Sequence, residues 1–426
     1  MIHTYEDPAK YKKSVLDNGI RIVTEQLPYF NSVSFGVWVR CGSRFETLQE
    51  NGISHFIEHM LFKGTTRRTS LDIAKEIDSV GGVLNASTGK EFTAFDCRVL
   101  EEHLEGAVDL LTDVFLNATF PENELERERQ VILQEICQLE DSPEELVHEI
   151  LLLEFWRDDP LGRPILGTIP TVSRFERDAL LAFKQRNYSA CDTVIAAAGK
   201  VDHDRLVDLL AKSMAMVANG TPRKHPNSAV SHVTSRVVEN DLEQVHVCIG
   251  AECPSALDER RHAGYVLNAL LGGGWSSKLF QEVREKRGLA YSVYSFLSMF
   301  SDTGILGIYA GCDPSRLEEL LEVVGWETSR LALSITQEDV SMAKRQIRGG
   351  VILGMESVEA RMNRLARNEY YYGHHKTLNE TLHSLDAVTL QDVVDLAEQL
   401  FGSGRMTLVA LGPVKNSRNI RSVFGK

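Results

Sequence analysis

The chain has 426 residues, of which 43% are hydrophobic and 25% charged, and its formal net charge is −14. This length is too great for one hydrophobic core, so we expect two or more domains of an ordinary soluble globular protein. The negative charge argues against a nucleic-acid-binding protein, because phosphates would be repelled, and it suits cationic partners.

The N-terminal stretch and the cysteines bear on location. The first 19 residues are charged and lack the apolar core of a secretory signal. No apolar run approaches the roughly 20 residues that span a bilayer, so no membrane partner is expected. The seven cysteines occur singly, without C-x-x-C spacing, which is typical of reduced thiols. We therefore expect a cytoplasmic protein.

The first half of the chain alternates clusters of strands with clusters of helices. Residues 19–27 and 33–43 have the β-branched and aromatic content of neighbouring strands. Helices are predicted over 52–62 and from Ser70, as N-cap, to Gly81. Two further strands and three long helices are predicted over 83–88, 91–100, 101–116, 122–140 and 143–156. Clustering of this kind predicts an α+β fold rather than regular βαβ alternation.

A polar, proline-containing stretch, 218–235, is the best linker candidate, and the sequence after it resembles the first half. The run from Val33 can be laid on the run from Val245 without a gap, which places Gly52 on Gly264. A period of half the chain indicates duplication. We therefore predict two domains of one fold, 1–217 and 236–426, joined by 218–235.

Three polar residues interrupt the apolar helix "GISHFIEHMLFKGT", which runs from Gly52 to Thr65: His55, Glu58 and His59. A single histidine on an apolar helix is most often a core residue with a local hydrogen-bond partner. Here the repeat provides an internal control, because its second copy carries three leucines at these positions. They are Leu267, Leu270 and Leu271. The architecture therefore tolerates leucine, and a metal site is the better interpretation.

The spacing of the triplet suits metal chemistry. Residues four apart on a helix lie about 40° from one another, so His55 and His59 project from one face. Two imidazoles at this spacing can share a zinc ion. Zinc lowers the pKa of water that it binds toward about 7, and the adjacent Glu58 carboxylate can accept the proton.

A catalytic zinc usually has three protein ligands, so a third must come from elsewhere. Periodicity alone does not choose among the glutamates of the helix 122–140, which are Glu122, Glu124, Glu126, Glu128, Glu135 and Glu140. Glu128 and Glu135 are seven apart and lie on nearly the same side. Glu135 stands among apolar residues and is the best candidate to point inward. The repeat places Ala343 near Glu128 and Gly350 near Glu135.

"HFIEHMLFKGT" followed by "ERERQVILQEI" resembles the pitrilysin/insulysin family of inverzincin zinc metallopeptidases. The resemblance is greatest to the half-length branch of mitochondrial processing peptidase and its bacterial relatives, and it covers nearly the whole chain. An H-x-x-E-H motif with a glutamate 76 residues after its second histidine is very specific, and Glu135 occupies that position. The resemblance implies two duplicated domains, each an antiparallel-rich sheet packed with helices.

Carried over residue by residue, the resemblance makes His55, His59 and Glu135 the ligands of one Zn²⁺ per chain and Glu58 the general base. Glu128 matches the auxiliary acidic residue, which supports the metal shell without binding the ion. Asn85 and Ala86, in "VLNAST", match the edge strand to which family members add an extended peptide substrate.

In the second domain, "GGGWSSKLFQEVREKRGLAYSV" resembles the family's glycine-rich loop and its Arg/Tyr pair, here Arg284 and Tyr291. Both side chains are good donors to a charged tetrahedral intermediate. Full-length relatives have four such domains, whereas this chain has two. The resemblance therefore implies a homodimer with composite sites, each zinc served by Arg284 and Tyr291 of the other chain. The expected substrates are short or unfolded peptides, with basic ones favoured by the −14 charge.

Three alternatives remain open at this stage. The chain could be an active subunit that needs a non-identical partner, a catalytically silent structural relative, or a zinc hydrolase that does not cut peptides. Two other stretches carry no predicted chemistry. "NEYYYGHHK", 368–376, is interpreted as packing aromatics and a polar turn, and "PLGRPILGT", 160–168, as a loop.

Overall fold

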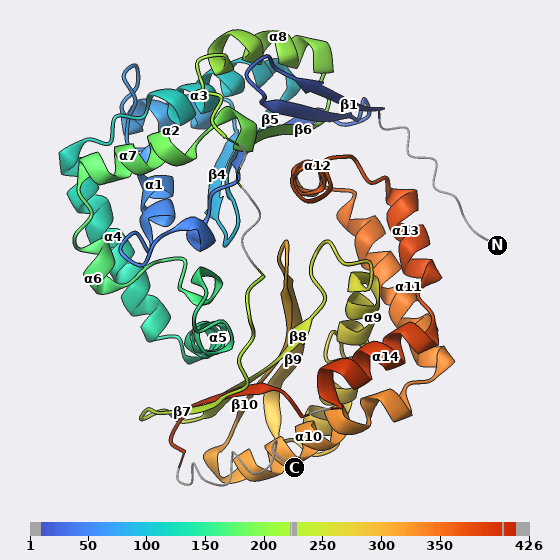
Figure 1. Ribbon diagram of the computed structural model, residues 1–426. Coiled ribbons are helices and arrows are strands. Elements are labelled where there is room, and N and C mark those ends of the chain that lie inside the picture. The colour runs from blue at the N-terminus through green and yellow to red at the C-terminus, as the bar shows by residue number, and fades with distance from the viewer. Residues whose placement is uncertain (1–9, 222, 224–227, 403, 415–426) are drawn as a thin grey trace. The chain divides into compact units, whose positions relative to one another are not determined.

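The computed structural model describes residues 10–221, 223, 228–402 and 404–414, which form two compact units. The first unit draws on residues within 1–138, 163–224 and 353–377, and the second on residues within 139–162, 225–352 and 378–426. Each unit is a mixed sheet packed with helices (Figure 1). This confirms the predicted fold class.

The first unit is built on a six-stranded sheet with the order β1-β2-β6-β3-β5-β4. Among the described strands of this sheet, only β2 and β6 pair in parallel, so the sheet is antiparallel-rich as expected. The strands are β1 (Lys10–Val15), β2 (Arg21–Gln26), β3 (Ser32–Val39), β4 (Val83–Thr88), β5 (Thr93–Leu100) and β6 (Thr193–Gly199).

β2 and β3 are not neighbours, although the sequence predicted that they would be. β6 lies between them, parallel to β2 and antiparallel to β3. Its sequence, TVIAAAG, is buried at every position. A strand buried on both faces belongs in the middle of a sheet, and this requirement outweighs the tendency of consecutive strands to pair.

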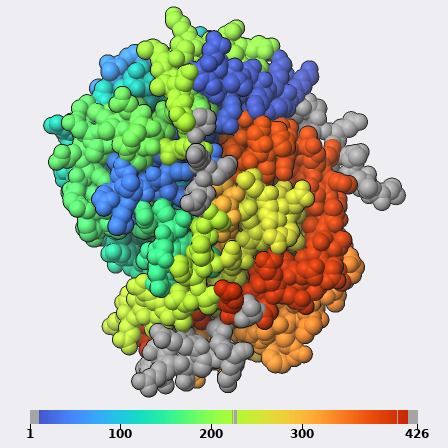
Figure 2. All heavy atoms as spheres, in the orientation of Figure 1, coloured from blue at the N-terminus to red at the C-terminus, as the bar shows by residue number. Residues whose placement is uncertain are grey.

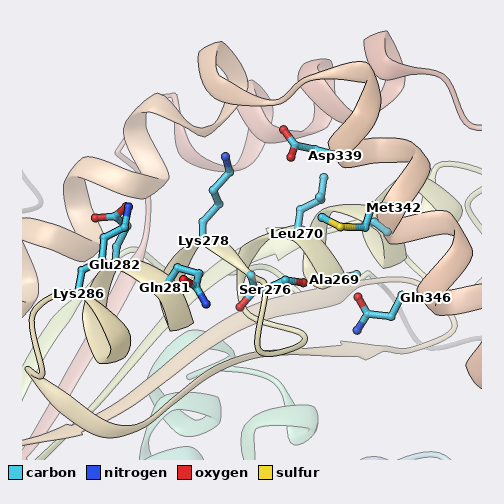
Figure 3. A pocket seen from close by; sticks show the side chains of 12 residues that line it. Ala269, Leu270, Ser276, Lys278, Gln281, Glu282, Lys286, Asp339, Met342 and Gln346 are labelled. Carbon is cyan, nitrogen blue, oxygen red and sulfur yellow. The ribbon is translucent and has the colours of Figure 1, made fainter.

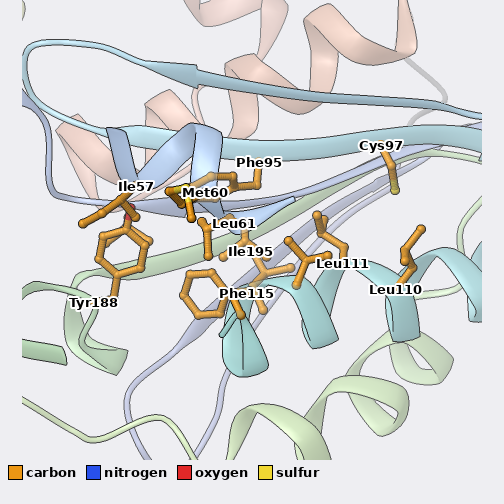
Figure 4. Close-up of a cluster of buried hydrophobic side chains, with 14 of the residues drawn as sticks. Ile57, Met60, Leu61, Phe95, Cys97, Leu110, Leu111, Phe115, Tyr188 and Ile195 are labelled. Carbon is orange, nitrogen blue, oxygen red and sulfur yellow. The ribbon is translucent and has the colours of Figure 1, made fainter. Parts of the chain in front are cut away.

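One face of this sheet packs against a helical layer that contains the candidate metal helix, α1 (Ile53–Leu61). Figure 4 shows Ile57, Met60 and Leu61 of α1 against Phe95 of β5 and Phe115 of α3. The first unit also contains these helices from the first half of the sequence: α2 (Ser70–Ser79), α3 (Leu104–Asn117), α4 (Glu122–Glu140), α6 (Ile169–Val172), α7 (Arg177–Asn187) and α8 (His203–Met214). The N-cap of α2 is Thr69 rather than Ser70, because Thr69 and Asp72 form a capping box.

The second unit repeats this design. Its five-stranded sheet has the order β7-β11-β8-β10-β9, and β7 and β11 are its parallel pair. The strands are β7 (Ser235–Glu239), β8 (Val245–Cys253), β9 (Ala290–Met299), β10 (Gly304–Cys312) and β11 (Thr407–Gly412). One face carries α9 (Arg261–Leu271), α10 (Leu317–Ser334), α11 (Gln337–Gly354), α13 (Leu378–Ala387) and α14 (Leu390–Phe401). The matching strand order confirms the duplication.

Two helices are exchanged between the units: α5 (Pro143–Phe155) lies in the first half of the sequence but packs in the second unit, and α12 (Val358–Tyr372) lies in the second half but packs in the first. α5 packs on β8 and β11 of the second sheet through Val147 and Leu151. α12 packs on β2, β3 and β6 of the first sheet through Met362 and Leu365. Figure 2 shows the orange atoms of α12 against the blue atoms of the N-terminal strands. Both faces of each sheet are apolar and must be covered, so the compact units differ from the contiguous ranges 1–217 and 236–426.

No helix among the described residues is long and apolar enough to cross a membrane.

Candidate metal centre

α1 presents two imidazoles on one side while its opposite side fills the core. Phe56, Ile57, Met60 and Leu61 are fully buried, whereas the rings of His55 and His59 stack edge to face with centroids 4.6 Å apart. Apolar residues at i, i+1, i+4 and i+5 give the helix its buried stripe, and the histidines occupy the margin of that stripe. The i, i+4 spacing therefore produces the shared face that the sequence predicted.

Glu135 of α4 completes a cluster with the two histidines. Its Oε2 lies 3.7 Å from Nε2 of His55 and 3.7 Å from Nε2 of His59. The three ligand atoms lie within 4.8 Å of one another, a separation that one metal ion can bridge. The Glu135 side chain is 37% exposed, so the cluster is open to solvent on this side. The structure thus brings together the three residues expected as ligands.

Glu128, about two turns before Glu135 on α4, contacts His59 through Nδ1, the ring nitrogen that does not face Glu135. Its Oε2 lies 3.0 Å from Nδ1 of His59, and its Oε1 accepts a hydrogen bond from Nζ of Lys63 at 2.7 Å. Glu128 is buried, and the carboxylate can only accept, so the proton of this contact resides on Nδ1. Nε2 of His59 is thereby left with its lone pair facing Glu135.

His55 is held as a neutral imidazole. Burial, with a smaller contribution from the nearby His59, lowers the pKa of His55 to about 3. A neutral ring is the form that binds a metal, since the lone pair must be free. This ionisation state is part of the fit between the donor set and zinc.

Glu58 lies beside the cluster and reaches the edge strand. Its Oε2 accepts a hydrogen bond from Oγ1 of Thr88, the last residue of β4, at 2.5 Å. Burial raises the pKa of Glu58, although the Thr88 hydrogen bond opposes the shift. A carboxyl with a raised pKa is a better proton acceptor, which is what a general base requires.

Asn85 and Ala86 lie in the middle of β4, the outermost strand of its sheet. Among the described residues β4 pairs only with β5, so its other edge offers backbone donors and acceptors. Asn85 is exposed and its side chain hydrogen-bonds to Asp96, the residue opposite it on β5. The edge has the geometry that strand addition needs.

Arg284 and Tyr291 belong to the second unit and contact each other. The Arg284 guanidinium lies 4.6 Å from the centre of the Tyr291 ring and 4.8 Å from that of Phe280. Tyr291 is 80% exposed, so its hydroxyl is available to another molecule. Stacking against these two rings orients the guanidinium, whose Nε lies 3.9 Å from Oε1 of Glu285.

The second unit has a cavity where the first has the metal cluster. Leu270 and Ala343, which the repeat aligns with Glu58 and Glu128, both line it, and its volume is about 220 Å³ (Figure 3). Lys278, Gln281, Met342 and Gln346 line it as well. The three ligand positions themselves carry Leu267, Leu271 and Gly350, so among the described residues α9 and α11 offer no set of metal donors.

Three residues that hold parts of the site in place were not predicted from the sequence. Thr88 and Lys63 hold Glu58 and Glu128, and Glu46 binds the start of α1. Thr88 could have been found from the register, since the strand "VLNAST" ends beside the metal helix. For Glu46 the sequence offered only one indication, which is that it aligns with Asp258 in the repeat.

Comparisons with known proteins agree with this geometry. Residues 21–169 match the family model "Insulinase (Peptidase family M16)", and residues 174–347 match "Peptidase M16 inactive domain". An uncharacterized zinc protease of Mycobacterium leprae is 41% identical over 96% of this chain and 93% of its own. The chain belongs to peptidase family M16.

Other M16 relatives match this chain over nearly their whole length. The uncharacterized zinc protease YmxG of Bacillus subtilis is 40% identical and covers 92% of this chain and 95% of its own, so the chain belongs to the half-length branch. A solved protease from Helicobacter pylori has a TM-score of 0.88 at 22% identity and covers 95% of this chain and 99% of that one. A Pseudomonas fluorescens structure, titled as a peptidase M16 inactive domain, has a TM-score of 0.89 at 20% identity and covers 95% and 98%. These structures share the fold, and the M16 sequence relatives indicate a zinc-dependent peptidase.

Proposed function

We propose that the chain is a zinc endopeptidase that cleaves short or unfolded peptides, with one Zn²⁺ per chain held by His55, His59 and Glu135. The observation that carries the proposal is the cluster of these three side chains, whose ligand atoms lie within 4.8 Å of one another. Two imidazoles and a carboxylate are a donor set typical of catalytic zinc, and three protein ligands leave a position for water.

Zinc, when bound there, would polarise the peptide carbonyl and acidify a water. Glu58 then acts as the general base. Its carboxylate accepts a proton from water as the water oxygen bonds to the carbonyl carbon, and it returns the proton to the leaving nitrogen as the C–N bond breaks. The products are one new carboxylate terminus and one new amine. The Thr88 hydroxyl fixes Glu58 throughout, through its hydrogen bond to Oε2.

The edge of β4 provides the substrate site in this proposal. A peptide added to β4 as an extra strand would be held by backbone hydrogen bonds, which accept any sequence. Asn85 and Ala86 would lie beside it. The Thr88–Glu58 hydrogen bond joins the end of the same strand to the base, so a peptide on this edge would run toward the base.

The Arg284 and Tyr291 pair would donate hydrogen bonds to the oxyanion of the tetrahedral intermediate. We assign the pair to the metal site of a second copy, so that a homodimer has two composite sites. A closed dimeric chamber would exclude folded proteins. All seven cysteines are free, which fits a reducing compartment, and on this ground we place the enzyme in the cytoplasm.

An assay of the chain purified alone tests the proposal. Gel filtration, zinc content and hydrolysis of a quenched basic peptide are measured on one sample before and after chelation. A zinc-containing dimer whose activity is lost on chelation and regained with zinc is the expected result. A zinc-containing chain that is inactive alone would favour the alternatives, a subunit that needs a different partner or a silent structural relative.

A further inference from the structure

The first turn of α1 is held from outside the helix by a buried carboxylate. Glu46, which is 3% exposed, accepts hydrogen bonds from the backbone N–H groups of Gly52 and Ser54, both at 2.8 Å. Asn51 Nδ2 donates to the same side chain at 3.2 Å. The first N–H groups of a helix lack partners within it, and the residue at the N-cap, Gly52, has no side chain to supply them. The Glu46 side chain therefore binds the N–H groups that an N-cap side chain would normally bind.

A loop that carries no predicted chemistry supports this arrangement. Nη1 of Arg163 donates to the backbone carbonyl of Glu46 at 3.0 Å, and Asn51 Nδ2 donates to a carbonyl of the same loop at 2.9 Å. Gly167 has a φ of +77° and packs against the backbone of Asn51 and Gly52. A Cβ there would lie 2.5 Å from the Asn51 carbonyl oxygen and 2.8 Å from Gly52 Cα. The loop thus fixes where α1 begins.

The two histidines of the cluster are oriented in different ways. Nδ1 of His59 contacts Glu128, as described above. Nδ1 of His55 is buried and has no hydrogen-bond partner in the described part of the chain. A metal-binding histidine is normally oriented through its second ring nitrogen. His55 directly follows Ser54, so its position depends on the backbone turn that Glu46 holds.

In the duplicated unit the aligned carboxylate is only partly buried and makes a different contact at the helix start. Asp258 aligns with Glu46, and its Oδ1 accepts from the Arg260 backbone N–H at 2.8 Å while its Oδ2 pairs with the Arg260 guanidinium at 2.6 Å. The N–H of Gly264, the counterpart of Gly52, donates to the Arg260 carbonyl instead. α9, which carries leucines in place of the metal ligands, therefore begins without a buried acid.

We propose that Glu46 is a positioning residue of the metal centre, which fixes His55 through the first turn of α1, with Arg163 and Gly167 as its outer support. The inference rests on the proposed function, since it assumes that His55 binds zinc. Glu46 does not contact the cluster, and its effect passes through the backbone alone.

The test compares Glu46→Gln with Asp258→Asn, the matched change in the unit without metal ligands. Zinc affinity is measured by competition with a chromophoric chelator, at a temperature where circular dichroism shows both variants folded. Glutamine presents an NH₂ group to one of the two backbone donors, so the turn loosens. We expect zinc binding about 10- to 100-fold weaker in Glu46→Gln, the loss typical of outer-shell partners, and wild-type affinity in Asp258→Asn.

Gly167→Ala is a second variant that displaces the same turn and leaves the carboxylate in place, and it is expected to weaken zinc binding in the same direction. If Glu46→Gln does not fold, the zinc affinity of Gly167→Ala tests the positioning role instead. Wild-type zinc affinity in a folded Glu46→Gln or Gly167→Ala variant would overturn the positioning role alone. A wild-type chain that holds no zinc would instead overturn the proposed function, and the inference with it.

Discussion

Nδ1 of His59 lies 3.0 Å from Oε2 of Glu128, and the other oxygen of that carboxylate is 2.7 Å from Nζ of Lys63. The carboxylate thus contacts the lysine through one oxygen and the imidazole through the other, and the second contact fixes the imidazole tautomer, so Nε2 of His59 is free to bind a metal. α1 and α4 are therefore joined at the site by a chain of polar contacts as well as by their apolar faces.

Glu128→Gln weakens this series of polar contacts while keeping the shape of the side chain. Because the amide can present its NH₂ group to Nδ1, the histidine loses its fixed tautomer, and zinc affinity is expected to fall about 10- to 100-fold. Chelator competition measures this loss. Glu126→Gln is the matched control, since Glu126 lies on the same helix, is exposed and pairs with Arg129. Equal affinity in the two variants would show that Glu128 does not orient the ligand.

The composite site can be tested by mixing inactive chains. Glu58→Gln lacks the base and Arg284→Ala lacks the guanidinium, so each homodimer should be inactive. A heterodimer has one intact site of its two, and random exchange should restore about a quarter of wild-type activity. Native mass spectrometry of the mixture verifies the exchange. No recovery in a sample that contains heterodimers would rule out the trans arrangement.

The exchanged helix α12 predicts a stability effect. Leu365 is 2% exposed and packs with Met362 against the face of the first sheet that carries Trp38 and Val194. Leu365→Ala leaves a cavity there and is expected to cost about 2–5 kcal/mol of unfolding free energy. Urea denaturation measures the change. Leu353, which is 67% exposed, provides the control Leu353→Ala, and an equal effect of both changes would contradict the packing.

A pH dependence follows from the burial of Glu46. Burial raises its pKa from the ordinary 4.5 to about 7, against the hydrogen bonds from Gly52 and Ser54, which lower it. Between pH 4.5 and about 7 the Glu46 carboxyl is therefore protonated in the folded chain and ionised in the unfolded chain. The Glu46 contribution therefore makes stability fall as pH rises from about 4.5 to 7 and become constant above that.

Chemical denaturation across this range measures the effect in the wild type and in Glu46→Gln. The variant has no ionisable group at position 46, so its stability should fall less between pH 5 and 7 than that of the wild type. Identical pH profiles for the two proteins would contradict the raised pKa.

The sequence predicted most of the site because its signals are local or duplicated. The i, i+4 histidines fix a shared face, and the leucines at 267, 270 and 271 separate metal ligands from structural residues. Periodicity alone did not choose among the glutamates of α4: Glu135 was favoured by its apolar neighbours, and the family resemblance assigned roles to Glu135 and Glu128. The pairing of β2 with β6 did not follow, because it depends on a strand more than 160 residues away in the sequence.

The exchange of α5 and α12 was not predictable for a related reason. The apolar residues of α12, such as Met362 and Leu365, indicate that the helix is buried but not which sheet it covers. Glu46 was missed because a carboxylate before a helix is usually exposed, and its burial depends on the loop that carries Arg163 and Gly167.

The most direct test of the proposed function measures zinc content and hydrolysis of a quenched basic peptide in the wild type and in Glu58→Gln. Glu58 is the proposed base and not a ligand, so both proteins should hold one zinc per chain. The variant should lose about 10²- to 10⁴-fold in activity, the range that general base catalysis supplies. Full activity in Glu58→Gln, or no zinc in the wild type, would contradict the proposed catalytic site.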